Sequence, residues 1–231
     1  AVMDFHGIAH ALLVGPNSGY NLDNRCMLNA IAKNKGRFKG VAVVKNNASH
    51  TELADLKAQG VVGVAMNASL LGVDFYSDIA PLLQRLHDLD MWAQMQVQHD
   101  QLVTLKPMLE ASGAKLIFDH CGRPNPLSGV AQAGFQALLS LAETGRAAVK
   151  LSGFNKCSAQ PYPWADAKVF VAALLEAYTP QNLVWASDWP FLKAPARMDY
   201  GPLQILFEEL VQNADARQLI LWDTPKRLFG F

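Results

Sequence analysis

Three groups of polar residues lie at the carboxyl ends of apolar runs that have the length of buried strands. They are Asp119-His120, Lys150 with Ser152, and Asp188. A partly desolvated carboxylate can act as a general base on water. A histidine can donate a hydrogen bond to a carbonyl or to an oxyanion. The segment WASDWP places Asp188 where a buried strand opens, so we interpret Asp188 and His120 as the candidate catalytic pair.

Each of these residues also has a purely structural interpretation. Asp188 could cap a helix or a loop, and His120 could bond a backbone carbonyl. Asp119 is predicted to be structural, because neighbours on a strand face opposite ways. Cys121 follows His120 directly, and this adjacency is the wrong geometry for a thiol–imidazole dyad. We therefore predict a small buried thiol at Cys121.

Cations at the strand ends predict an anionic substrate. The candidates are Arg123, Lys150 and Lys156, and the alternative for each is a solvated surface charge. Polar residues of the segment GPNSGY could hydrogen-bond the same ligand, although the segment could equally be a turn. These further substrate-binding candidates are Asn17, Ser18 and Tyr20.

Seven short runs rich in Val, Leu, Ile or Met predict the strands that would carry these side chains. Most are almost continuously apolar, which is typical of parallel strands covered on both faces. Segments with apolar residues three and four apart lie between several of them and predict helices. Examples are TELADLKAQG with Leu53 and Leu56, and SDIAPLLQRLHDLD with Leu82, Leu83 and Leu86. The runs are Ala11–Gly15, Gly40–Val44, Val61–Asn67, Met91–Val97, Lys115–His120, Ala148–Gly153 and Leu183–Asp188.

Alternating strands and helices imply an α/β fold with a parallel sheet and outer helices. An open doubly wound sheet and a closed (β/α)8 barrel both fit. The open sheet usually has a glycine-rich phosphate turn after its first strand, whereas GPNSGYNLDN contains no G-x-G-x-x-G. Polar residues at nearly every strand end are typical of a barrel active site. We therefore predict a (β/α)8 TIM barrel that forms a single domain over residues 1–231.

A (β/α)8 barrel has eight strands, and the apolar pattern gives seven. The segment MDFHGIAH, near the start of the chain, predicts the end of a helix that stops at Gly7. A helix tail at this point implies a preceding strand. We therefore expect the first βα unit to lie upstream of residue 1.

Composition excludes several classes of function. The 231 residues include 20 basic and 20 acidic side chains, which predicts neither nucleic acid nor an anionic membrane as a partner. No apolar run approaches the ~18 residues of a membrane-spanning helix. The three cysteines are an odd number at unrelated spacings, which favours a reducing compartment and predicts a cytoplasmic protein. We expect a small-molecule substrate, and a homo-oligomer is possible.

Four motifs carry a resemblance to a known family. FDHCGRP, VKLSG, WASDWP and WDTPKRLFGF resemble, in this order and spacing, the amidohydrolase family that includes 2-pyrone-4,6-dicarboxylate lactonase. The resemblance implies a (β/α)8 barrel that hydrolyses a lactone. It also implies that Asp188 is the carboxylate of the eighth strand and His120 the histidine of the sixth. The family's first-strand His-x-His pair has no counterpart in this chain, since His6 and His10 lie too far apart.

Whether the site binds a metal depends, within the family it resembles, on the residues of the fifth strand. Many amidohydrolases bind zinc through the first-strand histidines, a fifth-strand histidine and the final Asp. The fifth strand here reads MQVQHD, so Gln96 and Gln98 stand where a ligand is expected, and glutamine is a poor zinc ligand. The related pyrone-dicarboxylate lactonase is understood to work without metal. We expect no metal cofactor, and if zinc is bound, His99 and Asp188 are the candidate ligands.

The resemblance predicts a hydrolase of a lactone or similar cyclic ester with an anionic or sugar-acid substrate. The lactonase pattern has an arginine where Lys156 stands, and arginines around the fourth strand where this chain has Val62 and Ala65. A sugar lactone or a monoanionic lactone is therefore as good a candidate as a pyrone dicarboxylate. One alternative is a decarboxylase or Schiff-base aldolase of a small keto-acid that uses Lys150. Another is a non-catalytic barrel that binds small acids.

Overall fold

The computed structural model describes residues 2–16, 19–34, 36–192, 194 and 196–231, and its backbone divides into two compact units. Within the first unit the strands β1 to β4 are parallel and hydrogen-bonded in chain order, and within the second unit β6 pairs with β7 in the same way. This confirms the predicted α/β class. Unit 1 comprises Ala1–Gln96, Thr104–Ile117 and Phe229–Phe231, and unit 2 comprises Val97–Val103 and Phe118–Leu228.

Every apolar run named above overlaps one strand of the structure. In unit 1, Ala11 pairs with Phe38, and the register between the next two strands shifts at Gly40 and Val41. In unit 2, Val149 pairs with Leu183. The strands are β1 Ala11–Val14, β2 Phe38–Ala42, β3 Val61–Asn67, β4 Trp92–Gln96, β5 Lys115–Phe118, β6 Ala147–Leu151 and β7 Leu183–Trp185.

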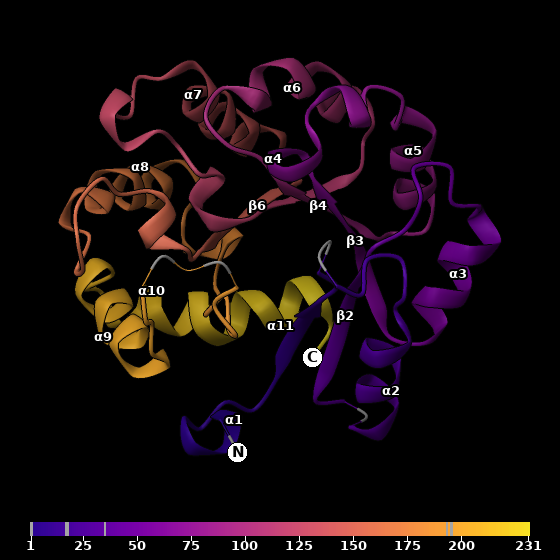
Figure 1. Ribbon diagram of the computed structural model, residues 1–231, viewed down its shortest axis with the longest axis horizontal. Helices are drawn as coiled ribbons and strands as arrows, with labels where there is room; N and C mark the ends of the chain where they lie inside the picture. The colour runs from indigo at the N-terminus through magenta and orange to yellow at the C-terminus, as the bar shows by residue number, and fades with distance from the viewer. Residues whose placement is uncertain (1, 17–18, 35, 193, 195) are drawn as a thin grey trace. The chain divides into compact units, whose positions relative to one another are not determined.

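Helices of unit 1 cover its strands, and α3 and α5 do so with the apolar residues that predicted them. Helix α3 begins at a Ser49 cap, whose hydroxyl accepts from the backbone N–H of Glu52 at 3.1 Å. It packs against β3 and against α5, whose buried face carries Leu82, Leu83 and Leu86 (Figure 1). These helices are α1 Val2–Phe5, α2 Arg25–Lys33, α3 His50–Ala58, α4 Ala68–Leu71 and α5 Ala80–Asp88, and most of α6 Gln101–Ala111.

Three of these helices were not predicted. The segments of α2, α4 and α6 were not recognised as helical in the sequence, and α6 contains Pro107, a residue that normally ends or bends a helix. The predicted helix tail near the start of the chain is confirmed as α1, which ends before Gly7.

Unit 2 supplies the second half of the strand and helix pattern. Helix α8 contacts both α7 and β6 (Figure 1). The rings of Phe135 and Phe170 meet edge to face at 5.1 Å, and the buried Tyr178 hydroxyl donates to Leu138 O at 2.6 Å. These contacts join α8 to α7. The helices are α7 Ala133–Ser140, α8 Lys168–Tyr178, α9 Tyr200–Leu210, α10 Ala214–Gln218 and, for the most part, α11 Thr224–Phe229.

No helix among the described residues is long and apolar enough to span a lipid bilayer.

Candidate active site

Three consecutive strand ends of unit 2 supply the candidate catalytic side chains. His120 follows β5 and begins the short 3-10 turn His120–Gly122. Lys156 ends another 3-10 turn, Phe154–Lys156, which follows β6. Asp188 follows β7. Because the carboxyl ends of parallel strands share one edge of a sheet, these three side chains can converge.

Lys156, Asp188 and His120 form one connected group, which we call the Lys–Asp–His cluster. The Lys156 ammonium donates to Asp188 Oδ2 at 2.5 Å and lies 3.3 Å from His120 Nε2. The other carboxylate oxygen of Asp188, Oδ1, lies 3.6 Å from the same imidazole nitrogen. The side chains of Lys156 and Asp188 are 22% and 28% exposed, against 9% for His120. A small ligand can therefore reach the ammonium and the carboxylate, whereas the imidazole lies behind them.

The backbone of this region adopts a conformation that most residues avoid. His120, Cys121 and Asp188 have φ angles of 52°, 54° and 59°, in the left-handed region, and none of them is glycine. Such residues cost of order 1–3 kcal/mol each and persist where the surrounding structure imposes them. Two members of the Lys–Asp–His cluster are thus held in a strained backbone conformation, which is common at functional sites.

His120 is neutral in this environment. Burial lowers the pKa of its imidazole to about 4, against the opposing attraction of Asp119, and Lys156 lowers it further. Asp188 favours the protonated ring and Lys150 disfavours it. A neutral imidazole has one donor nitrogen and one acceptor nitrogen, so the direction of its hydrogen bonds can be assigned from its neighbours.

Lys150 lies in a buried ion pair. Its ammonium is 2.9 Å from Asp119 Oδ1, and the two side chains are only 6% and 9% exposed. The strand alternation that led us to interpret Asp119 as structural agrees with this placement. The pair does not leave Lys150 open to a substrate in this structure. An amine enclosed in this way is also a poor candidate for the Schiff-base chemistry considered above.

We expect Lys150→Met to destabilise the protein, because it removes the ammonium that faces a buried carboxylate. Breaking a buried ion pair from one side typically costs about 3–5 kcal/mol of unfolding free energy. Urea unfolding would measure the loss. The matched control is Lys106→Met, since Lys106 pairs with Glu110 at 3.2 Å on the surface of α6. That pair should be worth no more than about 0.5 kcal/mol. Equal effects of the two substitutions would contradict the structural role of Lys150.

Arg123 lies close enough to the Lys–Asp–His cluster to interact with it electrostatically. Burial lowers the pKa of its guanidinium, while the neighbouring Cys157, Asp188 and Asp119 favour the charged form. Its carbonyl accepts the backbone N–H of His99 at 3.0 Å. Arg123 therefore stays a candidate for binding an anionic substrate.

Three other residues were predicted to bind the substrate, and no contact among the described residues links them to the Lys–Asp–His cluster. Tyr20 lies in unit 1 with 57% of its surface exposed. Asn17 and Ser18 lie outside the described residues. Their predicted roles in substrate binding stay predictions.

The donor set at the Lys–Asp–His cluster does not fit a zinc ion. The described part of the chain contains no group of three or more His, Cys, Asp or Glu side chains that could hold a metal. The ammonium of Lys156 lies between Asp188 and His120, where it would repel a second cation. His99 is exposed, and the Gln96 amide donates to Ser69 Oγ at 3.2 Å in unit 1.

Two cysteines near His120, Cys121 and Cys157, have buried thiols. Cys121 and Cys157 are both 0% exposed, and Cys157 Sγ donates to the backbone oxygen of His120 at 3.3 Å. A hydrogen bond with Cys121, together with burial, raises the pKa of the Cys157 thiol. Buried thiols with a raised pKa are poor nucleophiles. The placement agrees with the structural role predicted for Cys121.

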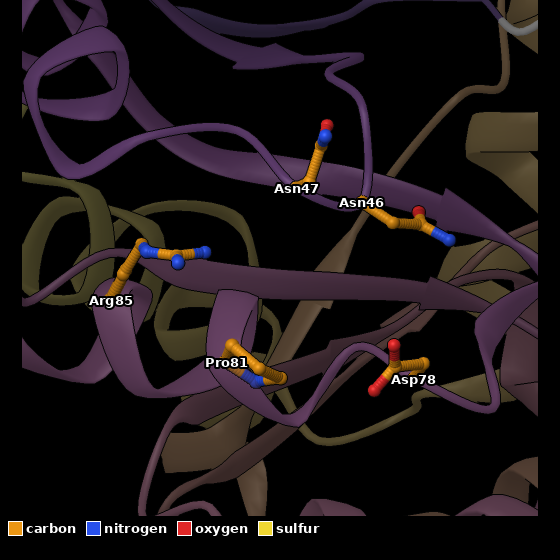
Figure 2. A pocket seen from close by; sticks show the side chains of 5 residues that line it. All are labelled: Asn46, Asn47, Asp78, Pro81 and Arg85. Atoms are coloured by element: carbon orange, nitrogen blue, oxygen red, sulfur yellow. The ribbon is translucent and has the colours of Figure 1, made fainter.

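A separate hollow of about 300 Å³ lies in unit 1, between the loop that follows β2 and the start of α5. Figure 2 shows Asn46 and Asn47 on one side of it and Asp78 and Pro81 on the other, with Arg85 extending toward it. The Asn46 amide donates to Phe75 O at 2.6 Å, and Arg85 donates to Ala48 O at 3.2 Å. These groups bond the protein's own backbone, so we assign them a structural role.

Ser152 and Gly153 hold the imidazole of the cluster, and the sequence interpretation gave neither of them a specific role. Ser152 Oγ lies 3.0 Å from His120 Nδ1. A Cβ atom added at Gly153 would lie 2.8 Å from the same nitrogen. The sequence signal was the motif VKLSG itself, in which a serine and a glycine end a buried strand.

Comparison with known proteins places the chain in a family. A family model described as "Amidohydrolase" matches residues 1–231, the whole chain. The chain belongs to the amidohydrolase family. Within it, the chain is 32% identical to a 4-sulfomuconolactone hydrolase of Rhizobium radiobacter, over all of this chain and 78% of that protein. It is 26% identical to a 2-pyrone-4,6-dicarboxylate hydrolase of Comamonas testosteroni, over 99% of this chain and 78% of that protein.

A solved structure matches the fold of this chain. A probable 2-pyrone-4,6-dicarboxylic acid hydrolase from Acinetobacter baumannii, crystallised with citric acid bound, aligns with a TM-score of 0.90 and 32% identity. The alignment covers 99% of this chain and 86% of that one. The match confirms the predicted TIM-barrel-like amidohydrolase fold and the resemblance found in the four motifs. The chain is thus related to lactone hydrolases.

Proposed function

We propose that this chain hydrolyses a lactone whose ring carries an anionic group. The observation that carries the proposal is the Lys–Asp–His cluster, in which a carboxylate and an ammonium lie 2.5 Å apart at a partly open site. Relatives that match nearly the whole chain are described as hydrolases of sulfomuconolactone and of pyrone dicarboxylate. Ester hydrolysis needs a base for water and an electrophile for the carbonyl, and the cluster contains one of each.

Asp188 is the general base of the proposed reaction. Its Oδ2 is engaged by Lys156, and its Oδ1 lies beyond hydrogen-bond distance from His120, at 3.6 Å. Oδ1 can therefore accept a hydrogen bond from a water molecule. As that water attacks the lactone carbonyl, its proton passes to the Asp188 carboxylate.

Lys156 polarises the lactone carbonyl. An ammonium group has three N–H donors. One N–H of Lys156 is directed at Asp188 Oδ2 and a second at His120 Nε2. The third can donate to the carbonyl oxygen and to the oxyanion that forms from it. Donors fixed in this way stabilise the developing charge. In this proposal Lys156 takes the oxyanion-binding role that the sequence suggested for His120.

The bonds and protons balance as in ordinary ester hydrolysis. Water forms a new bond to the carbonyl carbon, and the ring C–O bond of the resulting tetrahedral intermediate breaks. The proton held by Asp188 goes to the departing alkoxide. The product is an open-chain hydroxy acid, or its keto tautomer where the ring oxygen belonged to an enol ester.

An anionic substituent on the substrate could form an ion pair with a cationic side chain near the cluster. Arg123 lies in this region, and its guanidinium can bind a carboxylate or sulfonate with two parallel hydrogen bonds. The related structure from Acinetobacter baumannii was crystallised with citric acid, a tricarboxylic acid. This supports a substrate with at least one acidic group.

A panel of lactones tests the proposed function. The purified protein would be incubated with an unsaturated sulfo- or carboxymuconolactone, 2-pyrone-4,6-dicarboxylate, a sugar-acid lactone and a neutral lactone. Ring opening would be followed by NMR in ¹⁸O-labelled water. We expect one anionic lactone to open with one ¹⁸O in the new carboxylate. Ligand binding without turnover would favour a binding protein. Borohydride trapping of a keto-acid on a lysine would favour an aldolase or decarboxylase.

We also expect the purified protein to hold no stoichiometric transition metal. The physical reason is the ammonium of Lys156, which lies where it would repel a cation bound by Asp188 and His120. Elemental analysis after expression in zinc-supplemented medium would test this, together with activity before and after dialysis against a chelator. About one zinc per chain, with activity lost on chelation, would contradict the prediction.

A further inference from the structure

Ser152 makes a hydrogen bond to one of the two ring nitrogens of His120. Its side chain is almost fully buried, with 1% of the residue exposed, and its Oγ lies 3.0 Å from His120 Nδ1. On the other side of the ring, Nε2 lies 3.3 Å from the Lys156 ammonium and 3.6 Å from Asp188 Oδ1. Only the first of these two distances is that of a hydrogen bond.

The charge of Lys156 fixes the direction of these bonds. An ammonium group donates and cannot accept. A neutral imidazole that meets it through Nε2 must therefore present a bare nitrogen there, and its proton must be on Nδ1. The Nδ1–H group then points at Ser152 Oγ, which accepts it. The alternative tautomer would direct an N–H at an ammonium and leave Asp188 too far away to receive it.

The surrounding backbone prevents the ring from turning away from this arrangement. Gly153 has φ +59°, and a Cβ atom there would lie 2.8 Å from His120 Nδ1 and 2.9 Å from its Cβ and Cγ. The imidazole thus packs directly against the glycine backbone. The Cys157 thiol donates to the His120 carbonyl at 3.3 Å and holds the backbone of the same residue. Ring and backbone are both positioned by residues that follow β6.

We propose that Ser152 is a positioning residue, which keeps His120 in the Nδ1–H tautomer so that its bare Nε2 accepts from Lys156 and orients the ammonium toward the substrate. Ser152 and His120 act through Lys156 and need not touch the reacting atoms. The kinetic part of this proposal rests on the proposed lactone hydrolysis. The tautomer itself does not depend on it.

NMR of the ¹⁵N-labelled protein tests the tautomer directly. The chain has six histidines, so the His120 signals would be assigned by their loss in His120→Gln. At neutral pH we expect a protonated, pyrrole-type Nδ1 and an unprotonated, pyridine-type Nε2. In Ser152→Ala the Nδ1 signal should lose its pyrrole character as the proton shifts toward Nε2, and Ser152→Thr, which keeps the hydroxyl, should restore it. A protonated Nε2 in the wild type, or an unchanged spectrum in Ser152→Ala, would overturn the proposal.

Kinetics give a second measurement. Loss of a group that orients a functional side chain typically costs about 10- to 100-fold in activity. We expect Ser152→Ala to lower kcat by this factor with KM nearly unchanged, because the ammonium is misdirected while the binding residues remain. The matched control is Ser140→Ala, which removes a hydroxyl that donates to Ala137 O on α7, away from the cluster.

The two measurements separate this proposal from the proposed function. If the wild type opens no lactone, the proposed function fails, and the spectra still decide the role of Ser152. If a lactone is hydrolysed and Ser152→Ala turns it over at the wild-type rate, the positioning role is wrong and the proposed function stands.

Discussion

Asp188→Asn is expected to abolish lactone hydrolysis while the fold and ligand binding persist. Asparagine keeps the size of the side chain and one acceptor oxygen, but it cannot take a proton from water. Loss of a general base typically costs about 10²–10⁴ in rate. The Asp188 carboxylate is 28% exposed, and it accepts a hydrogen bond from the Lys156 ammonium at 2.5 Å. Among the described acidic residues, Asp188 is the one that forms an ion pair with Lys156.

The measurement is kcat and substrate affinity for the wild type and the variant on the lactone that the panel identifies. The matched control is Asp199→Asn, because Asp199 is an exposed carboxylate that pairs with Arg197 at the surface of the same unit. The control should keep wild-type kinetics. If Asp188→Asn retained more than about a tenth of kcat, it would lie outside the range for losing a general base, and the assignment would be abandoned.

Lys156→Met is expected to have the second largest effect. Methionine keeps an unbranched side chain of similar length and removes the ammonium. Loss of one donor to a developing oxyanion typically costs about 10²–10³ in kcat. Lys156→Arg keeps the charge and should retain more activity than Lys156→Met, although a planar guanidinium cannot reproduce the two bonds that the ammonium makes to Asp188 and His120.

The control for Lys156→Met is Lys168→Met at the first residue of α8, where the lysine is exposed. The double variant Asp188→Asn with Lys156→Met supplies a further test. Because the two groups are in direct contact, their effects should be far from additive. Additive effects would show that Lys156 does not act on the same step as Asp188. Wild-type kcat in Lys156→Met would remove it from the proposed mechanism.

Much of the fold was accessible from local patterns in the sequence. Near-continuous apolar runs such as Val61–Asn67 predicted strands, because a parallel strand buried on both faces excludes polar residues. The spacing of Leu82, Leu83 and Leu86 predicted α5, since one helix face must be apolar to cover the sheet. Helix α6 was not predicted, and Pro107 lies inside it. Local propensity disfavours proline there, so contacts outside the local sequence must compensate.

Local sequence patterns also indicated two candidate catalytic residues. Asp188 and His120 were chosen as candidate catalytic residues because each lies at the end of a buried strand, and parallel strands place such residues at one edge of the sheet. That inference needs only the strand pattern. It says nothing of which atoms face each other.

The three-dimensional structure gives different surroundings to two lysines that look alike in the sequence. Lys150 and Lys156 both lie at the end of the β6 segment, and both were predicted to bind substrate. Lys150 is still within the strand, where its ammonium meets the buried Asp119 at 2.9 Å. Beyond the strand, Gly153 takes a left-handed conformation, and the 3-10 turn Phe154–Lys156 then follows. This turn brings the Lys156 ammonium to Asp188, a residue far along the chain. Only the packing of separate segments in three dimensions can determine such a contact, because no local pattern of residues encodes the distance between two side chains on different strands.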